Sequence, residues 1–420
     1  MPDALRREGQ LARGLPEMRN EARAREGVDG FQLGEVPALT NDFGGQLALV
    51  MSGGGARAAY QVGMLRWLAR RHPDLHVPIL TGVSAGAINA AFLASHPGNF
   101  RERVGELSDL WGHLTTEEVF RVDSLSLARN VVRLGLKLFS GGAMVAPRSH
   151  AAVDTKPLWS LLERVLGARG DELPGIDANL RRGALKAVAI TTSSYTTGQS
   201  ITWVQGGGIP QWERAHRKSI DAKLNVRHVM ASAALPIFFP AIEIDGQWFG
   251  DGGIRLTAPL SPAVHLGADR ILAISTRYPR TRAEADRPLV NGYPPPAQIM
   301  GALFNAVFLD LFDADALTME RVNKVTETQP SEMRCDYRPI KLVVLRPSRD
   351  LGKLANDYEA RLPGAFRFLT RGLGTRETRS NDLLSLLMFQ PDFLTRLIEL
   401  GEADAELRRD ELEGLLGGPP

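Results

Sequence analysis

Cysteine is almost absent from this chain, because Cys335 is the only one in 420 residues. A single cysteine excludes an internal disulfide bond and any metal site built from several thiolates. Such sparing use of cysteine is typical of reducing compartments. The acids and histidines also lack the spacing of a calcium-binding loop. We therefore expect a cytoplasmic protein that requires neither a metal ion nor another cofactor.

An excess of charge of one sign is also missing. Lys and Arg total 50 and Asp and Glu total 48, which gives a formal net charge of +2. A chain without a strong basic field has no general attraction for phosphate backbones. We therefore expect no nucleic-acid partner.

The chain contains no clean apolar run of membrane-spanning length. Residues 1–29 mix six arginines with six acids, so this segment resembles neither a signal peptide nor an anchor, and we expect 1–44 to be a mobile tail. The longest uncharged stretch, 77–100, is interrupted by proline, glycines and polar residues. We expect no transmembrane helix, and any membrane contact would be peripheral.

Apolar strand-like runs alternate with helical patterns along the chain. Leu47–Met51 and His76–Thr81 read as buried strands, and each is followed by a helical pattern, over about 58–71 and 87–95. This alternation predicts an α/β fold with a mostly parallel sheet. Further predicted elements are strands at 185–192, 200–205, 247–249, 270–275 and 340–345, a helical insertion over about 101–182, and a long amphipathic helix at 297–324.

The second strand leads into a GxSxG pentapeptide, Gly82-Val83-Ser84-Ala85-Gly86. A serine between a strand and a helix in this motif occupies a sharp turn that exposes its hydroxyl. Gly82 and Gly86 allow that turn because a side chain at either place would crowd the neighbouring strand and helix. The motif predicts that Ser84 is a nucleophile.

A nucleophilic serine needs a base, and no histidine stands out for that role. His265 is the best candidate for a histidine-dependent hydrolase, which stays an alternative. One acid is better displayed, because Asp251 ends a predicted strand and is followed by Gly252 and Gly253. Such glycines let a carboxylate approach another segment closely, although an ordinary Asp-Gly turn has the same pattern.

The first strand leads into the loop Gly53-Gly54-Gly55-Ala56-Arg57. Successive backbone N–H groups before a helix form an anion-binding concavity, which suits a reaction oxyanion or a nucleotide phosphate. The loop half matches the dinucleotide fingerprint but lacks a well-placed acid about 20 residues later. A non-catalytic phosphate- or nucleotide-binding module is therefore a second alternative.

Taken in order, these motifs resemble the patatin-like phospholipase family. The resemblance rests on the Gly53–Arg57 loop, the Ser84 pentapeptide and Asp251-Gly252-Gly253, and it covers roughly 47–275. Residues 231–240, with Ala-Ser-Ala-Ala-Leu-Pro followed by Phe-Phe-Pro, are similar to a stretch that usually precedes the family's Asp-Gly motif. Ala58 stands where the family often has glycine.

The resemblance implies a three-layer α/β/α fold and a Ser84–Asp251 dyad without histidine. The catalytic domain would occupy 45–276, and 277–420 would be a mainly helical extension packed on it. The oxyanion hole would be formed by the loop and the residue after the nucleophile, with Arg57 either positioning the loop or meeting an anionic head group; its members are Gly53, Gly54, Gly55, Ala56, Arg57 and Ala85.

The expected substrate is a lipid ester such as a phospholipid or lysophospholipid, hydrolysed through an acyl-serine. Transfer of the acyl group to another acceptor would use the same dyad. Ile237, Phe238 and Phe239 are expected to line an acyl channel or meet a lipid surface, with core packing as the alternative. The same alternatives hold for an apolar helix face comprising Met300, Leu303, Phe304, Val307, Phe308, Leu311 and Phe312. The sequence does not indicate an oligomeric state.

Overall fold

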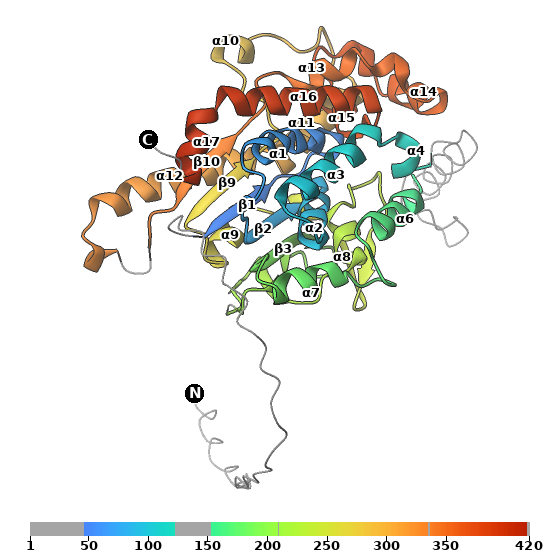
Figure 1. The fold of residues 1–420 in the computed structure, drawn as a ribbon. Helices are drawn as coiled ribbons and strands as arrows, with labels where there is room; N and C mark the ends of the chain where they lie inside the picture. Colours follow the sequence, from blue (N-terminus) through green and yellow to red (C-terminus); the bar gives the residue numbers. More distant parts are fainter. Residues whose placement is uncertain (1–45, 122–152, 209, 335–336, 418–420) are drawn as a thin grey trace, which may run out of the picture. The chain divides into compact units, whose positions relative to one another are not determined.

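A computed structural model describes residues 46–121, 153–208, 210–334 and 337–417. The segment from Asp42 to Pro420 forms one compact unit. The expectations for the 1–44 tail and for a helix within 125–139 lie outside the described residues. Figure 1 shows how the described elements are arranged around a central sheet.

The described part of the sheet contains ten strands. Its main path runs β10-β9-β1-β2-β3-β4-β6-β5, and β8 pairs with both β3 and β7. The pairs from β10 through β3 are all parallel, whereas β3 pairs with β4 and β8 in antiparallel orientation. The strands are β1 Leu47–Met51, β2 Ile79–Val83, β3 Ala187–Ser194, β4 Ser200–Gly206, β5 Glu213–Arg214, β6 Arg217–Asp221, β7 Ile242–Ile244, β8 Gln247–Asp251, β9 Arg270–Ile274 and β10 Lys341–Leu345.

Helices surround this sheet, and two short 3₁₀ turns, η1 Gly55–Ala58 and η2 Gly252–Ile254, follow the glycine motifs. The described helices before β9 are α1 Ala59–Arg71, α2 Ala85–Ser95, α3 Phe100–His113, α4 Thr116–Val119, α6 Lys156–Val165, α7 Pro174–Arg181, α8 Val226–Ser232 and α9 Ser261–His265. Those after it are α10 Arg282–Ala285, α11 Pro296–Phe308, α12 Asp310–Thr328, α13 Leu351–Asn356, α14 Gly364–Gly372, α15 Asp382–Leu387, α16 Pro391–Leu407 and α17 Arg409–Leu416.

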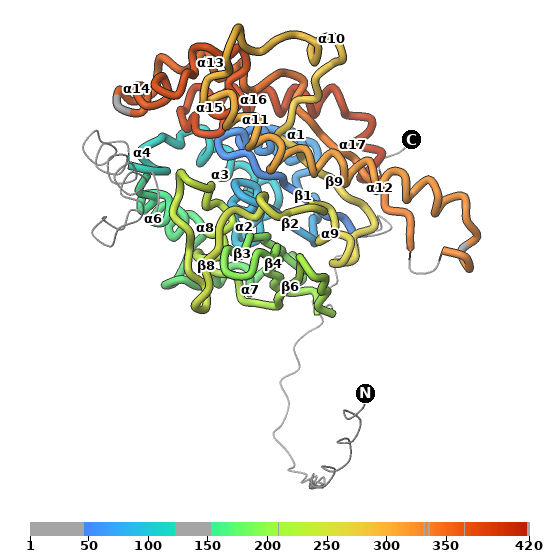
Figure 2. Tube along the Cα trace, turned by 180° about the vertical axis from the view of Figure 1, so that it is seen from behind, coloured from blue at the N-terminus to red at the C-terminus, as the bar shows by residue number. Residues whose placement is uncertain are grey.

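Strand β1 shows why the sheet is covered on both faces. Leu47, Leu49 and Met51 belong to one apolar core, together with residues of α1, α2, α3 and α16. Ala48 and Val50 belong to a second core, with residues of α9 and α12. Because alternate residues of a strand point to opposite faces, a wholly apolar strand requires a helical layer on each side. Figures 1 and 2, drawn from opposite sides, show these two layers, and the predicted α/β fold with a mostly parallel sheet is confirmed.

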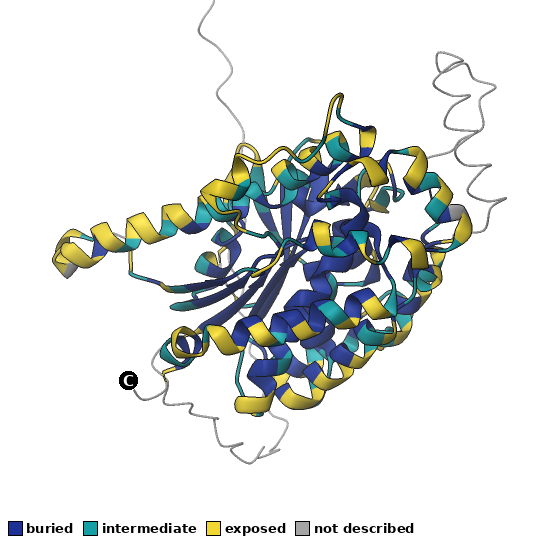
Figure 3. Ribbon diagram, turned by 90° about the horizontal axis from the view of Figure 1, so that it is seen from above, coloured by how far each residue is buried: buried dark blue, intermediate teal, exposed yellow. Residues whose placement is uncertain are grey.

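The C-terminal extension departs from its prediction in one helix and confirms its predicted strand. The expected single helix at 297–324 is two helices, because the backbone departs from helical geometry at Leu309. The strand predicted at 340–345 is β10, which pairs in parallel with β9, so the sheet continues past residue 276. Figure 3 shows the sheet as a buried blue layer between helices whose outer faces are exposed.

One helical stretch, Pro296–Thr328, is long and apolar enough to cross a membrane by length and composition. Only 22% of its tested window is buried. Phe304 and Phe312 on this stretch nevertheless pack into the two cores of the protein. A core helix of a soluble protein passes the same test of length and composition, so we describe α11 and α12 as helices packed on the sheet.

Candidate active site

Ser84 occupies the turn between β2 and α2 in a strained conformation. Its φ of 55° and ψ of −130° lie in a region that side chains other than glycine rarely adopt. The flanking glycines explain how this turn fits into the fold. A Cβ atom at Gly82 would lie 2.3 Å from the Gly86 carbonyl oxygen, and one at Gly86 would lie 2.4 Å from the Met51 carbonyl oxygen. Helix α2 begins directly after Ser84, two residues earlier than the sequence predicted.

Ser232 holds the backbone of this turn. The Ser84 N–H donates a hydrogen bond of 3.0 Å to the Ser232 hydroxyl oxygen, and that hydroxyl donates one of 2.7 Å to the Thr191 carbonyl. Helix α8 thus connects the turn to strand β3. The sequence singled out the 231–240 stretch but gave Ser232 no role, because no local pattern indicates a bond across 148 positions.

Asp251 lies at the end of β8, opposite Thr192 of β3. Its side chain is fully buried, and its Oδ1 accepts a hydrogen bond of 2.9 Å from the Gly253 N–H. The other carboxyl oxygen, Oδ2, has no hydrogen-bond partner among the described residues. Gly252 permits this position, because a Cβ atom there would lie 2.0 Å from the Thr191 carbonyl oxygen.

Burial raises the pKa of Asp251 to about 7. The Ser84 hydroxyl and the Gly253 N–H act in the opposite direction because both interact favourably with the charged carboxylate. Because Ser84 contributes to the pKa of Asp251, the two residues lie near each other although they are 167 positions apart, and their action as a dyad stays a prediction. A carboxyl group with a pKa near neutrality is well matched to proton transfer.

The glycine loop after β1 lies directly beside Ser84. A Cβ atom at Gly53 would be 3.0 Å from the Ser84 Cβ, and both Gly54 and Gly55 have positive φ angles. The N–H groups of Gly53 and Gly54 have no acceptor among the described residues. Ala56 continues the loop into η1, and Ala85 follows the nucleophile at the start of α2. The oxyanion hole that the sequence assigns to these residues stays a prediction.

Arg57 points from this loop into the C-terminal extension. Its guanidinium is buried and forms an ion pair of 2.7 Å with Asp382 of α15. It also donates hydrogen bonds of 2.8 Å to the Ser385 hydroxyl and 3.3 Å to the Asn305 side-chain oxygen. These contacts engage the guanidinium within the protein, and both predicted roles of Arg57 stay predictions. The sequence could not name the partners, because they lie about 250 to 330 positions away.

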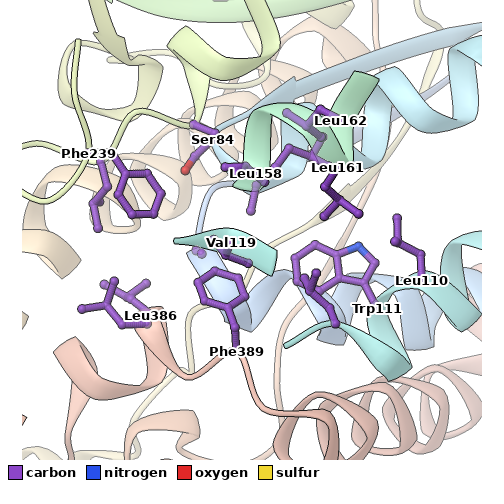
Figure 4. A pocket seen from close by; sticks show the side chains of 18 of the residues that line it. Ser84, Leu110, Trp111, Val119, Leu158, Leu161, Leu162, Phe239, Leu386 and Phe389 are labelled. Atoms are coloured by element: carbon purple, nitrogen blue, oxygen red, sulfur yellow. The ribbon is translucent and has the colours of Figure 1, made fainter. Parts of the chain in front are cut away.

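A pocket that is partly open to solvent begins at Ser84. Figure 4 shows Ser84 between Phe239 and Leu158, with Trp111 and Leu110 farther from the serine. The remaining wall is almost wholly apolar and includes Gly54, Gly55, Ala85, Ile88, Leu114, Val119, Leu161, Leu162, Val165, Ala233, Leu235, Phe308, Leu386, Leu387 and Phe389.

The apolar side chains expected in an acyl channel, at a lipid surface or in the core are divided among the pocket wall, the protein surface and the core. Phe239 and Phe308 line the pocket, but Ile237 and Leu303 are exposed and Phe312 packs in the core on the other face of the sheet. Helices α3, α6 and α15 instead contribute eight of the 17 apolar side chains that line the pocket. Helical periodicity identifies an apolar face but does not identify what that face contacts, so the sequence could not assign these walls.

No histidine occurs among the described residues that line the pocket. His265, the alternative base, stacks on Trp212 with ring centroids 4.5 Å apart. Burial and two nearby arginines, Arg217 and Arg214, lower its pKa. In the described part of the chain, no group of three or more His, Cys, Asp or Glu residues could hold a metal ion.

Comparison with known proteins places this chain in a family. The model of the patatin-like phospholipase family matches residues 49–264, just over half of the 420-residue chain. The chain therefore belongs to the patatin-like phospholipases, a family of lipid-hydrolysing enzymes. No curated protein gives a significant match to it.

Several solved structures are similar in fold. VipD from Legionella pneumophila has 13% sequence identity and a TM-score of 0.38, with 89% of this chain and 67% of VipD covered. The type III effector ExoU of Pseudomonas aeruginosa has 15% sequence identity and a TM-score of 0.36, with 88% of this chain and 53% of ExoU covered. Human GIVD cytosolic phospholipase A2 has 12% sequence identity and a TM-score of 0.42, with 90% of this chain and 60% of that protein covered. The chain thus spans about half to two thirds of the length of these proteins, and identities this low concern the fold alone.

Proposed function

We propose that this protein is a lipid acyl hydrolase that cleaves fatty-acyl esters of phospholipids or lysophospholipids through an acyl-serine intermediate on Ser84. The observation that carries the proposal is the buried Asp251 carboxyl, whose pKa is raised to about 7 and which interacts with Ser84 at the wall of an apolar pocket. Family membership supports the same chemistry at a coarser level.

In the proposed first step, the Asp251 carboxylate takes the Ser84 hydroxyl proton as Ser84 Oγ attacks the ester carbonyl. The N–H groups of Gly53 and Gly54, with that of Ala85, stabilise the oxyanion. Collapse of the tetrahedral intermediate breaks the ester C–O bond, and the leaving alcohol receives the proton from Asp251. The acyl chain stays on Ser84 and occupies the apolar pocket.

In the second step, Asp251 removes a proton from water, and the resulting hydroxide attacks the acyl-serine carbonyl. The fatty acid leaves, and the proton returns to Ser84 Oγ. The apolar wall favours a fatty-acyl chain over a charged nucleotide, because an unpaired phosphate is costly to bring into apolar surroundings. An alcohol in place of water would give acyl transfer by the same steps.

The proposal is tested with Ser84→Ala and Asp251→Asn. We expect the rate of ester hydrolysis to fall at least about a thousandfold in both variants, because removing either member of a catalytic unit disables the whole unit. Asp245→Asn is the matched control, since Asp245 is an exposed residue of the β7–β8 turn on the same hairpin. Hydrolysis of a phospholipid and a short soluble ester is measured after circular dichroism confirms folding.

Labelling separates the roles of the two residues. A fluorophosphonate should attach to Ser84 in the wild type and in Asp245→Asn, and should not attach in Ser84→Ala. Full turnover by a folded Ser84→Ala or Asp251→Asn variant would exclude the dyad. Product analysis in the presence of a competing alcohol distinguishes hydrolysis from acyl transfer.

A further inference from the structure

Three large hydrophobic side chains near the pocket are exposed to solvent. Phe368 on α14 is 82% exposed, Ile237 in the loop after α8 is 66% exposed, and Leu303 on α11 is 60% exposed. Single exposed hydrophobic residues are common on protein surfaces and need no explanation. These three side chains need an explanation because contacts between aromatic rings connect the segments that carry them.

The connection is a cluster of aromatic rings that reaches the pocket wall. Phe120 packs with ring centroids 5.9 Å from Phe239 and 6.3 Å from Phe389, and both of these line the pocket. Phe120 also packs 5.2 Å from Phe366, which lies two residues before Phe368. Phe239 likewise lies two residues after Ile237. Phe368 and Ile237 therefore belong to two segments that this cluster joins.

Leu303 joins the group through its neighbour on α11. The Phe304 ring lies 6.2 Å from that of Phe238, next to Ile237, and 5.7 Å from that of Phe308, which lines the pocket. Figures 1 and 2 place α14 on the same side of the molecule as α4. Helix α4 ends at Val119, directly before Phe120. All three exposed residues thus belong to segments that form or support the pocket wall.

Ile237 is held outward by an unusual backbone conformation. Its φ is 72°, a left-handed value that is an outlier for a β-branched residue. Such strain persists only where the surrounding structure enforces it, and it concentrates at functional sites. The proposed hydrolysis does not involve Ile237, so its exposed and strained position has no explanation within the catalytic site.

The chain around Phe368 is basic. Residues 359–379 contain five arginines and two glutamates, a net charge of +3. Arg371 and Arg376 lie 3.8 and 3.9 Å from Glu359, and Arg361 pairs with Asp392. The Arg367 side chain, next to Phe368, donates to the Ala360 carbonyl and forms no ion pair among the described residues. An exposed aromatic ring beside arginines on a helix is the arrangement that binds anionic lipid surfaces.

We propose that Phe368, Ile237 and Leu303, with the arginines of α14, form a docking surface for an anionic phospholipid bilayer. This proposal rests on the proposed function, because a bilayer at this surface would present lipid esters beside the pocket that begins at Ser84. The apolar side chains enter the acyl-chain boundary of the bilayer, and the arginines contact the head groups.

The test measures co-sedimentation with vesicles in a Ser84→Ala background, so that no lipid is consumed. The vesicles contain either phosphatidylcholine alone or phosphatidylcholine with phosphatidylglycerol. We expect stronger binding to the anionic vesicles. Phe368→Ser should reduce that binding about tenfold, the cost of no longer burying one large apolar side chain. A Phe368→Ser/Ile237→Ser double variant should reduce it further.

Leu407→Ser is the matched control. Leu407 is 79% exposed but ends α16, and Figure 1 shows α17 and α14 at opposite ends of that helix. We expect Leu407→Ser to bind vesicles as the background does. In chains with Ser84 intact, Phe368→Ser should hydrolyse a short soluble ester at the wild-type rate but vesicle lipid more slowly.

Equal binding of Phe368→Ser and the background would overturn the proposal. Failure of the background to bind either vesicle would also overturn it. Because binding is measured without catalysis, these outcomes are independent of whether Ser84 proves to be the nucleophile. Loss of the proposed function alone would appear as vesicle binding without ester hydrolysis in the wild type.

Discussion

Two residues of the candidate site are held in states that cost stability. Ser84 has a positive φ, which costs about 1–3 kcal/mol for a residue other than glycine. Asp251 buries a carboxyl whose Oδ2 has no hydrogen-bond partner among the described residues. Unfavourable states of this kind gather at active sites, where they prepare a group for reaction. At the scale of single residues, the strained backbone of Ser84 and the buried carboxyl of Asp251 distinguish the candidate site.

Asp251 should make activity and stability change in opposite directions with pH. Its folded-state pKa, about 7, lies above its ordinary value near 4. Between these values the folded protein binds more protons than the unfolded chain, so stability falls as pH rises through this interval. The carboxylate needed as a base forms over the upper part of the same interval. We expect kcat/KM for a soluble ester to increase up to about pH 7 and then level off.

The stability effect is measured by comparing thermal unfolding of wild type and Asp251→Asn at pH 4 and pH 8. An uncharged Asn does not titrate. The free energy of unfolding of Asp251→Asn should therefore exceed that of the wild type most at pH 8, by on the order of 4 kcal/mol at the upper limit. Asp245→Asn should show no such difference between the two pH values. A gain that is the same at pH 4 and pH 8 would contradict a raised pKa at Asp251.

At the scale of elements, α15 supports the glycine loop 53–57 from outside the family-matched region. Asp382 and Ser385 hold Arg57, and a Cβ atom at Gly55 would lie 2.2 Å from the Leu386 carbonyl oxygen. The same helix places Leu386 and Leu387 in the pocket wall. The loop after β1 and α15 therefore act as one packed unit, although the family model ends at residue 264.

Breaking the Arg57–Asp382 ion pair should disturb this unit. Removing one partner of a buried pair leaves an uncompensated charge and typically costs about 3–5 kcal/mol. We expect Asp382→Asn to lower the melting temperature and, in the folded state, to lower kcat at least about tenfold with a smaller effect on KM. Asp382→Glu should recover part of the rate because it restores the charge.

The matched control for this prediction is Asp392→Asn. Asp392 pairs with Arg361, but both side chains of that pair are about half exposed, and exposed pairs contribute at most about 1 kcal/mol. Wild-type turnover of a soluble ester is expected for this control. If Asp382→Asn is destabilised but keeps the wild-type kcat well below its melting temperature, α15 does not position the loop.

At the scale of the whole molecule, the C-terminal extension is part of the core. Helix α16 packs against α1 so closely that a Cβ atom at Gly63 would lie 2.0 Å from the Ile398 carbonyl oxygen. Strand β10 extends the sheet beyond β9. Without α16 and β10, α1 and β9 would expose apolar faces that the intact chain buries.

A fragment that ends at residue 276, the predicted domain boundary, should therefore fail to fold alone. We expect residues 45–276 to be insoluble or to lack a cooperative thermal transition, because the buried faces of α1 and β9 would be open to water. Soluble yield and circular dichroism are compared with those of the full chain. A soluble monomer with a sharp transition would show that 45–276 is an independent domain.

The sequence by itself determined the local chemistry of this protein. The apolar run 47–51, the glycine loop after it and the GxSxG turn lie close together along the chain, so composition and spacing predicted the strand, the loop and the display of Ser84. The glycine-flanked Asp251 and the order of the motifs then predicted the family, which the comparisons confirm. Close backbone approaches can be predicted this way because they require glycine.

Only the tertiary structure decided which distant residues meet. The raised pKa of Asp251 depends on burial by other elements, and the bond from Ser84 to Ser232 spans 148 positions. The partner of Arg57 and the apolar wall from α3, α6 and α15 are equally long-range. An apolar helix face shows the same periodicity in a core, a pocket or an exposed surface. What each face contacts, and which hydrophobic side chains stay exposed, depends on the packing of the whole chain.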